Sequence, residues 1–376
     1  MKNIPPVDLT RQYQTISEEA NAAVLEVLSS GGYIGGATVT DFQRQFAQYI
    51  GVSESVACNS GTDALYLALR ALNIGPGDEV ITSPFTFFAT AEVITLVGAT
   101  PVFVDIELET FNLNVQQISA SITAKTKAIM PVHLFGQPAT MTPLMAIASA
   151  NNLVVIEDCA QATGAEWKGQ KIGSIGQVGC FSFFPTKNLG ACGDGGIVST
   201  DDQAIASTMR MLKEHGSRVR YRHDTIGINS RLDAVQAAIL QIKLRYLDSW
   251  NQERREIAAR YQQLLEHIPG IALPQSLPES KHVWNQYTIR VLDKEQGKEP
   301  LRDEVRHQLQ QMGINSMIYY PIPLQLQPVY QDLGYQLGQL PVSEQAAREV
   351  LSLPMFPGLT FEEQERVADG LKNCLK

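Results

Sequence analysis

The chain has 376 residues, of which 44% are hydrophobic and 18% are charged, as is usual for a globular protein with a sizeable core. This composition excludes a disordered chain, and the length predicts one large domain with a smaller one. The net charge of −9 argues against a dedicated nucleic-acid-binding protein. No apolar run reaches the roughly 18 residues that a membrane helix needs. The N-terminal segment lacks the apolar core of a secretory signal, so we expect a cytoplasmic protein without a membrane partner.

The cysteines are scattered along the chain, and their spacing is not that of a metal site. Their number, 5, is odd, and no CxxC pair or Cys/His cluster occurs. This pattern favours reduced, mostly structural thiols, and we predict no metal centre. The cysteines are Cys58, Cys159, Cys180, Cys192 and Cys374.

Short apolar runs alternate with helical patterns between about residues 55 and 200. The first helical pattern places Ala64, Leu65, Ala68 and Leu72 on one face and ends at Gly75-Pro76-Gly77. Buried strands are predicted at 80–82, 100–106, 127–133, 153–158, 180–184 and 196–200. This alternation predicts an α/β fold with a mostly parallel central sheet. Such a sheet binds ligands at the carboxyl ends of its strands.

A second, smaller domain is predicted after a long helical stretch. That stretch begins near Arg231 and closes at Pro269-Gly270, and a strand pattern at 282–292 follows it. Two later helical patterns complete an α+β unit. We therefore assign residues 1–250, including an N-terminal arm, to the large domain and residues 251–376 to the small C-terminal domain.

Lys187 is the first candidate for chemistry. It follows the strand pattern at 180–184 and is flanked by a proline and several glycines, which places it at the ligand end of the sheet. An ordinary loop lysine exposed to solvent is the alternative interpretation.

Asp158 closes the apolar run at 153–158, so its carboxylate is expected at the mouth of the sheet. Two interpretations of this residue stay open. Its side chain can cap a helix that begins near Cys159. It can instead face a pyridinium nitrogen and keep it protonated, which makes pyridoxal phosphate an electron sink.

A phosphate site is suggested by the segment at 59–69, in which Ser, Gly and Thr enter a predicted helix. The first amides of a helix point outward and can bind a phosphate group, although such helix starts are common. The glycine-rich segment at 31–36 follows a helical pattern and not a strand, which disfavours a dinucleotide-binding fingerprint.

Several motifs occur in the order that is found in one protein family. The chain resembles the pyridoxal-phosphate sugar aminotransferases of the DegT/StrS group, which have the fold-type I architecture, and the resemblance covers nearly the whole chain. The motifs are NSGT (59–62), TFFA (86–89), PVHLFG (131–136), IEDCAQ (156–161), SFFPTKNLG (182–190), GDGG (193–196), GINSRL (227–232), YPIPL (320–324) and LPM (353–355).

The resemblance implies pyridoxal phosphate as the cofactor and gives each cofactor-binding residue a role. Lys187 corresponds to the lysine that forms a Schiff base with the cofactor, and burial beside a cationic group lowers a lysine pKa. Asp158 corresponds to the partner of the pyridine nitrogen. Gln161, expected three residues further on the same helical face, corresponds to the contact of the phenolic oxygen. The other implied contacts are Phe87 on the pyridine ring, Gly61, Thr62 and Ser182 at the phosphate, and Asn229 at the phosphate from the second subunit.

The resemblance assigns Asn229 to the cofactor phosphate of the second subunit. It therefore implies a homodimer with two shared active sites. Arg231, nearby in the chain, has two interpretations. It can bind a substrate carboxylate bidentately, or it can form a salt bridge within the dimer.

The segment at 213–223 is basic. It carries Lys213, Arg218, Arg220 and Arg222 among few acids. One interpretation is a solvated loop. The other is a lid that meets a nucleotide diphosphate, whose charge the protein's net charge otherwise repels.

Three positions depart from the family pattern, in which some or many relatives have histidine. They are Tyr319 before Tyr320, Gln325 after the Pro-Leu step, and Asn285. Tyr319 and Tyr320 are expected to bind the substrate, while the departures leave the identity of the sugar open.

The resemblance implies transfer of an amino group from glutamate to a keto-sugar nucleotide. Similarity at 215–231 and in YPIPL favours 3-keto sugars linked to UDP or dTDP. A sugar dehydratase of the same group has histidine in place of Lys187 and is disfavoured. A cyclitol aminotransferase keeps the same residues and stays an alternative. A non-catalytic regulator on the same scaffold is the alternative from another class of protein.

Overall fold

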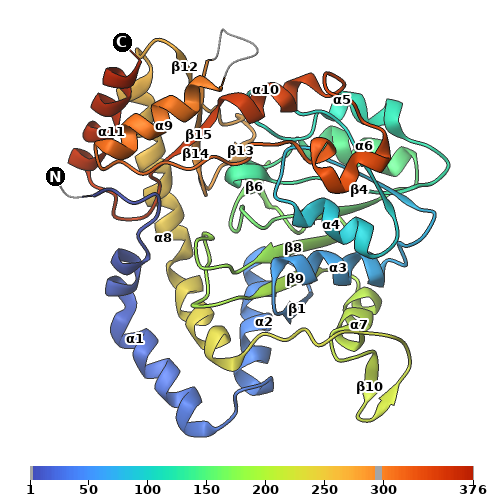
Figure 1. The fold of residues 1–376 in the computed structure, drawn as a ribbon. Coiled ribbons are helices and arrows are strands. Elements are labelled where there is room, and N and C mark those ends of the chain that lie inside the picture. Colours follow the sequence, from blue (N-terminus) through green and yellow to red (C-terminus); the bar gives the residue numbers. More distant parts are fainter. Residues whose placement is uncertain (1–2, 293–298, 376) are drawn as a thin grey trace.

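Figure 1 shows a computed structural model of the chain, which describes residues 3–292 and 299–375. A central sheet of seven strands is covered by helices on both faces. Its strands are β1 (Glu54–Cys58), β2 (Glu79–Thr82), β3 (Thr100–Phe103), β4 (Thr126–Met130), β5 (Val154–Asp158), β8 (Val178–Ser182) and β9 (Gly196–Thr200). Their order across the sheet is β1-β9-β8-β5-β4-β2-β3.

The sheet is mostly parallel, as predicted. Strand β9 pairs antiparallel with β1 and β8, while the other neighbouring strands pair parallel. All six predicted strands are present, but β1 was not among them. Its apolar run is short and is flanked by Ser55 and Asn59, so it gives a weak strand pattern.

Side chains of alternate strand residues build one apolar layer on each face of the sheet. Val56 of β1 packs with α3 (Gly61–Ala71), α4 (Ala89–Leu96) and α7 (Gln203–Leu212). Ala57 packs with α2 (Gly36–Ile50) and α8 (Ala234–Leu265). Val155 of the central strand β5 packs with α5 (Val115–Ile118) and α6 (Met141–Ala150). Both faces of the sheet are therefore buried.

Helix α8 passes from the core of the large sheet to a second core. Leu240 and Leu247 belong to the first core, whereas Ile257 and Tyr261 belong to the second. Ile4, near the N-terminus, also packs in the second core. Residue 250 lies within α8, and the division into domains 1–250 and 251–376 stays a prediction.

The C-terminal part is an α+β unit built on a three-stranded sheet of order β12-β14-β15. Its strands are β12 (Ile271–Ala272), β14 (Tyr287–Val291) and β15 (Val350–Leu353), and its helices are α9 (Leu301–Gln311), α10 (Pro341–Glu349) and α11 (Phe361–Cys374). The strand predicted at 282–292 is thus confirmed only over β14. The expectation of two later helices is wrong, because the described residues form three.

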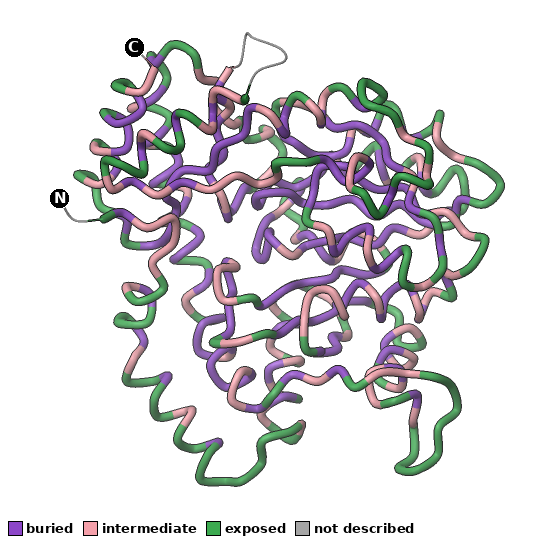
Figure 2. The backbone as a smooth tube through the Cα atoms, viewed as in Figure 1, coloured by how far each residue is buried: buried purple, intermediate pink, exposed green. Residues whose placement is uncertain are grey.

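Two elements stand out from the body of the molecule. Helix α1 (Leu9–Ser30) packs on α8 through Ile16 and Ala20. A hairpin of β10 (Ser217–Val219) and β11 (Arg222–His223) projects beside α7 (Figure 1). Figure 2 shows much of both as exposed chain, in contrast to the buried central strands.

A further small sheet joins β6 (Glu166–Trp167), β7 (Gln170–Lys171) and β13 (Ser280–Lys281). It connects the loop after β5 to the chain before β14. Among the residues described, no helix has both the length and the apolar character required to cross a membrane.

Candidate active site

A cavity of about 570 Å³ lies where the parallel strands end. Its walls come from the loop after β2, from the ends of β5 and β8, and from the start of α3. Tyr319 and Tyr320 of the C-terminal part close one side. Every site residue predicted from the sequence lines this cavity, except Asn229 and Arg231. The residues that do so are Gly61, Thr62, Phe87, Asp158, Gln161, Ser182, Lys187, Tyr319 and Tyr320.

The start of α3 forms one wall. Gly61 and Thr62 begin the helix, and the Ser60 hydroxyl caps it by accepting a 3.1 Å hydrogen bond from the N–H of Asp63. A Cβ atom on Gly61 would lie only 2.6 Å from Cβ of Ser182, so glycine allows the end of β8 to approach the helix. Free N–H groups at a helix start attract an anion, which suits this wall to a phosphate group.

Lys187 lies in a tight turn after β8. Its N–H donates to the carbonyl oxygen of Phe184 over 2.9 Å. The turn needs glycine at 190, since a Cβ atom there would lie 2.3 Å from the Pro185 carbonyl oxygen. Burial lowers the pKa of Lys187 to about 8, and the nearby charge of Asp158 opposes that shift. Lys187 is therefore a cavity residue whose amine is partly unprotonated near neutral pH, and not an ordinary loop lysine.

Asp158 ends β5 with a buried carboxylate. Its Oδ2 accepts a 2.8 Å hydrogen bond from Oγ1 of Thr90, and its Oδ1 accepts a 3.1 Å bond from the N–H of Ala160. Burial raises the pKa of Asp158, while these hydrogen bonds and the charge of Lys187 act in the opposite direction. The expectation of a helix near Cys159 is wrong, because residues 159–165 form turns. Asp158 caps a turn and at the same time lines the cavity.

Gln161 is fixed at both ends of its amide group. Its Oε1 accepts a 2.7 Å hydrogen bond from the N–H of Phe135, and its Nε2 donates over 3.2 Å to the hydroxyl of Tyr320. The expected helical face is absent because a turn carries Gln161. The turn nevertheless brings Gln161 and Asp158 to the same cavity.

The aromatic rings of Phe87 and Tyr320 form another part of the cavity wall. Phe87 is 59% exposed in the wall, and its ring centroid lies 6.3 Å from that of Tyr320. An exposed ring beside a carboxylate and a lysine suits stacking on a flat, charged ligand. Burial raises the pKa of the Tyr320 phenol, so this group stays protonated at neutral pH.

Comparison with known proteins assigns the chain to a family. Residues 14–372 match the DegT/DnrJ/EryC1/StrS aminotransferase family. The chain belongs to this family. The family expected from the sequence motifs is thus confirmed.

Relatives of similar length are available for comparison. The chain is 48% identical to a pleiotropic regulatory protein of Geobacillus stearothermophilus, over 98% of both chains. It is 45% identical to a UDP-N-acetyl-3-dehydro-α-D-glucosamine 3-aminotransferase of Acidithiobacillus ferrooxidans, over 99% of this chain and 98% of the relative. It is 43% identical to a dTDP-3-amino-3,4,6-trideoxy-α-D-glucose transaminase of Streptomyces venezuelae, over 98% of this chain and 95% of the relative.

A solved structure confirms the fold class. The crystal structure of DesV from S. venezuelae is similar to this chain with a TM-score of 0.95 and 42% identity, over 100% of this chain and 99% of DesV. The α/β, fold-type I architecture of the aminotransferase family is therefore the architecture of this chain.

Two residues expected from the aminotransferase motifs do not line the cavity of their own chain. The backbone of Asn229 pairs with that of Glu214. The Nε atom of Arg231 lies 2.9 Å from Oε2 of Glu214, so Arg231 forms an ion pair within its own subunit. Both residues lie at the base of the basic segment 213–223.

The basic segment forms the β10–β11 hairpin and also stays outside this cavity. Arg218 donates from Nη1 to Oγ of Ser207 over 2.7 Å. Nε of Arg222 lies 3.4 Å from a carboxylate oxygen of Asp224. The hydrogen bond of Arg218 and the ion pair of Arg222 are both exposed to solvent, and exposed contacts of charged side chains stabilise little, so both arginines can exchange them for an anion at little cost.

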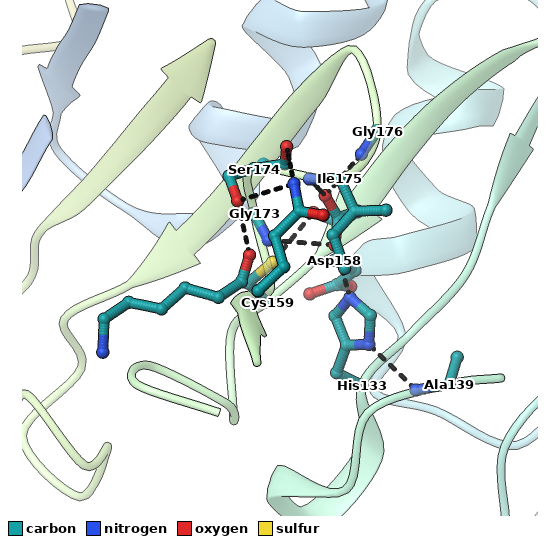
Figure 3. Close-up of polar contacts among 12 residues, drawn as sticks. His133, Ala139, Asp158, Cys159, Gly173, Ser174, Ile175 and Gly176 are labelled. Carbon is teal, nitrogen blue, oxygen red and sulfur yellow. Dashed lines mark hydrogen bonds and ion pairs between the residues drawn. The ribbon is translucent and has the colours of Figure 1, made fainter. Parts of the chain in front are cut away.

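His133 and Glu157 form a buried pair next in the chain to Val132 and Asp158 of the cavity wall, and Figure 3 shows the contacts of His133. Nε2 of His133 is 3.0 Å from Oε2 of Glu157, and Nδ1 of His133 accepts a hydrogen bond from the N–H of Ala139. Glu157 also accepts hydrogen bonds from the N–H groups of Gly173, Ile175 and Gly176. With Cys159 these side chains are close enough to hold a metal ion. The carboxylate and both ring nitrogens are already bonded, however, so the cluster anchors loops next to Asp158.

Some site residues were not found from the sequence. Thr90 was not singled out, although its spacing of four residues from Thr86 at a helix start was an available signal. Asn285 was noted only as a departure, and it lines the cavity. Gln325, another departure, is buried, and neither atom of its amide has a hydrogen-bond partner among the described residues.

Proposed function

We propose that this chain is a pyridoxal-phosphate-dependent aminotransferase that moves an amino group from glutamate to a keto-sugar nucleotide. The convergence of Lys187, Asp158 and the start of α3 on one cavity carries the proposal. The amine fits the aldehyde of the cofactor, the carboxylate fits its pyridine nitrogen, and the helix amides fit its phosphate. The names of the UDP-sugar and dTDP-sugar relatives support the substrate class.

Lys187 has two tasks in this proposal. Its amine would hold the cofactor in the cavity, and once free of the cofactor the same amine would take the proton from Cα of the amino donor. When bound, pyridoxal phosphate supplies an electron sink for the negative charge that develops at that carbon. A pKa of about 8 suits an amine that must accept and return a proton near neutral pH.

The other cavity residues orient the cofactor. Asp158 keeps the ring nitrogen protonated, and its hydrogen bonds from Thr90 and Ala160 favour the ionised carboxylate that this task needs. Gln161, fixed by Phe135, contacts the phenolic oxygen. Gly61, Thr62 and Ser182 hold the phosphate, and Phe87 covers the ring.

We also propose a homodimer with shared active sites. Asn229 lies outside the cavity of its own chain, as expected for a residue that reaches the phosphate in the partner's site. Leu25 and Leu28 on α1, and Tyr33 and Ile34 between α1 and α2, are each about half exposed or more. Such an apolar patch needs a cover, and a second copy supplies one.

The β10–β11 hairpin is proposed to meet the nucleotide diphosphate of the substrate in the partner's site. Its arginines supply the positive charge that an anionic substrate needs against a net charge of −9. Arg231 is proposed to bind a substrate carboxylate, which requires it to leave Glu214. Tyr319 and Tyr320 are proposed to contact the sugar, which we expect to be a 3-keto sugar linked to UDP or dTDP.

Single-turnover assays test this function. The purified protein is loaded with pyridoxamine phosphate and incubated with UDP- and dTDP-linked 3-keto and 4-keto sugars, and with scyllo-inosose. We expect the visible absorbance of lysine-bound pyridoxal phosphate to return with a 3-keto sugar nucleotide, together with the mass of the amino sugar. A response to the cyclitol alone would favour a cyclitol aminotransferase. Bound cofactor without any turnover would favour a regulator, the description that one relative carries.

A further inference from the structure

Three buried asparagines form a continuous chain of side-chain hydrogen bonds behind the Lys187 turn. Asn285 donates from Nδ2 to Oδ1 of Asn188 over 2.9 Å, and Asn188 donates from Nδ2 to Oδ1 of Asn251 over 2.7 Å. Asn251 in turn donates to the carbonyl oxygen of Thr163 over 3.1 Å. The three side chains are 1–3% exposed. We call Asn285, Asn188 and Asn251 the asparagine ladder.

The asparagine ladder connects segments that are far apart in the sequence and meet at the cavity. Asn188 directly follows Lys187, and Thr163 belongs to the turns that carry Gln161. Asn285 lines the cavity itself, whereas Asn251 lies on α8 and does not. One row of amides therefore ties the lysine turn to the Gln161 segment, to the cavity wall and to the long helix.

The surroundings of the asparagine ladder are shaped to accommodate it. Gly164 has a φ of +89°, and a Cβ atom there would lie 2.8 Å from Nδ2 of Asn251. The second N–H of Asn188 donates to the carbonyl oxygen of Val283 over 2.9 Å. Buried amides are costly unless they are paired, and a fully paired row is rigid.

Helix α8 also anchors the asparagine ladder at its Asn285 end. Arg254 lies three residues after Asn251, on the same side of the helix. The buried Nη1 of Arg254 donates to the carbonyl oxygens of Trp284 and Met355, over 3.1 and 3.2 Å, and makes a longer contact of 3.4 Å with that of Asn285. The row is thus anchored on α8 both through Asn251 and through the backbone at 284–285.

We propose that the asparagine ladder holds the Lys187 turn in the position that amine transfer requires, so that Asn285, Asn188 and Asn251 are positioning residues. The catalytic part of this proposal rests on the proposed function. A lysine that releases the cofactor and later recaptures it must return its Nζ to one place. Misplacement of a reacting group by 1 Å can cost about 100-fold in rate, so a fixed backbone beneath Lys187 matters.

The test compares Asn251→Ala with Gln364→Ala. Asn251 touches neither the cavity nor Lys187, so its removal acts through its hydrogen bonds to Asn188 and to the Thr163 carbonyl oxygen. Gln364 is a matched control, because it is a fully buried amide that donates to α8, at the carbonyl oxygen of Ile257 over 2.9 Å. Two readouts are taken: hydrogen–deuterium exchange of residues 183–191 in the apoprotein, and the single-turnover rate of the loaded enzyme with glutamate.

We expect both variants to lose thermal stability to a similar degree, but only Asn251→Ala to loosen the lysine turn. Its amides at 183–191 should exchange about tenfold faster, and its single-turnover rate should fall at least about tenfold with little change in cofactor affinity. Equal exchange at 183–191 in the two variants would overturn the proposal. Faster exchange without a slower reaction would overturn its catalytic part.

A second variant covers the case in which Asn251→Ala does not fold. Asn285→Ala removes the asparagine that lies at the cavity end of the asparagine ladder, and it leaves the hydrogen bond between Asn188 and Asn251 intact. It should speed exchange at 183–191 as well, and unchanged exchange would contradict the proposal. The apoprotein readout is independent of cofactor chemistry, so a failure of the proposed function would not be mistaken for a failure of the asparagine ladder.

Discussion

Oγ1 of Thr90, in the first turn of α4, donates a 2.8 Å hydrogen bond to Oδ2 of Asp158 at the end of β5. The hydroxyl of Thr86 lies 3.1 Å behind that of Thr90, and all three side chains are buried. Burial raises the pKa of Asp158, whereas the bond from Thr90 lowers it. Thr90 therefore helps to keep the carboxylate ionised where it faces the pyridine nitrogen in our proposal.

The substitution Thr90→Val removes this hydroxyl with little change in volume. The pKa of Asp158 should rise, so the acid limb of the pH profile of kcat/KM should move to higher pH. Loss of a hydrogen bond to a charged group costs about 1.5–3 kcal/mol, so we expect at least a tenfold lower kcat at pH 7. The pH–rate profile is the measurement, with Thr90→Ser as a rescue. Thr95→Val on the same helix is the control. If the acid limb of Thr90→Val lies at the same pH as that of the control, Thr90 does not help to keep Asp158 ionised.

The substitution Gly61→Ala tests the phosphate wall. Its Cβ atom would meet Cβ of Ser182 at 2.6 Å, so the start of α3 and the end of β8 must separate. We expect the Kd for pyridoxal phosphate to rise more than about tenfold, or about 1.4 kcal/mol. Gly75→Ala is the matched control, since a Cβ atom there meets only the Val97 carbonyl oxygen at an ordinary 3.5 Å. Equal affinities in the two variants would place the phosphate elsewhere.

Lys187→Met should stabilise the apoprotein at neutral pH. Burial lowers the pKa of Lys187 from 10.5 to about 8, so the charged amine destabilises the folded state. Below pH 8 the amine is charged in both the folded and unfolded states, and this penalty is complete. Between pH 8 and 10.5 only the unfolded chain keeps the proton, so the stability of the wild type rises and the advantage of the variant shrinks.

The expected gain at pH 7 is about 1–3 kcal/mol in the free energy of unfolding, after allowance for water in the cavity. Urea unfolding of the apoprotein at pH 7 and pH 10.5 measures it. A variant that is less stable than the wild type at pH 7, or that keeps its full gain at pH 10.5, would show that burial does not lower the pKa of Lys187.

Complementation tests the shared active site. Lys187→Ala and Asn229→Ala should each be nearly inactive, because every site in either homodimer lacks one contribution. In a mixed dimer, one site receives the native Lys187 from one chain and the native Asn229 from the other. Activity should therefore recover in part when the two variants are co-expressed. Mixed dimers without recovery above the better single variant would show that Asn229 does not act across the interface.

The sequence predicted the parts of the fold that carry strong local patterns. Apolar runs located the strands around the cavity, and the positions of Asp158 and Lys187 just at or after strand ends placed both in it. Strand β1 was missed because its run is short. A helix was expected at 159–165, where the structure has turns. The small residues there fit both conformations, and the packing of the loop after β5 selects the turns.

The contacts between segments that are far apart in the chain could not be predicted from the sequence. Thr90 and Asp158 are 68 residues apart, and Asn285 and Asn188 are 97 residues apart. Hydrophobic periodicity says nothing about which buried amide meets which. From the sequence, Asn285 was singled out only as a departure from the expected family pattern, whereas the structure shows that its amide nitrogen donates to Asn188 beside Lys187.

The identity of the lysine that carries the cofactor is the central claim, and borohydride reduction tests it most directly. The enzyme loaded with pyridoxal phosphate is reduced, digested with trypsin and mapped by mass spectrometry. Lys243 is the strongest competitor, since it is also buried with a lowered pKa, although its Nζ is bonded to the Gly190 carbonyl oxygen at 2.6 Å. We predict the reduced cofactor on the peptide that contains Lys187, and its absence in Lys187→Ala. A reduced adduct on Lys243 or on any other lysine would contradict the account.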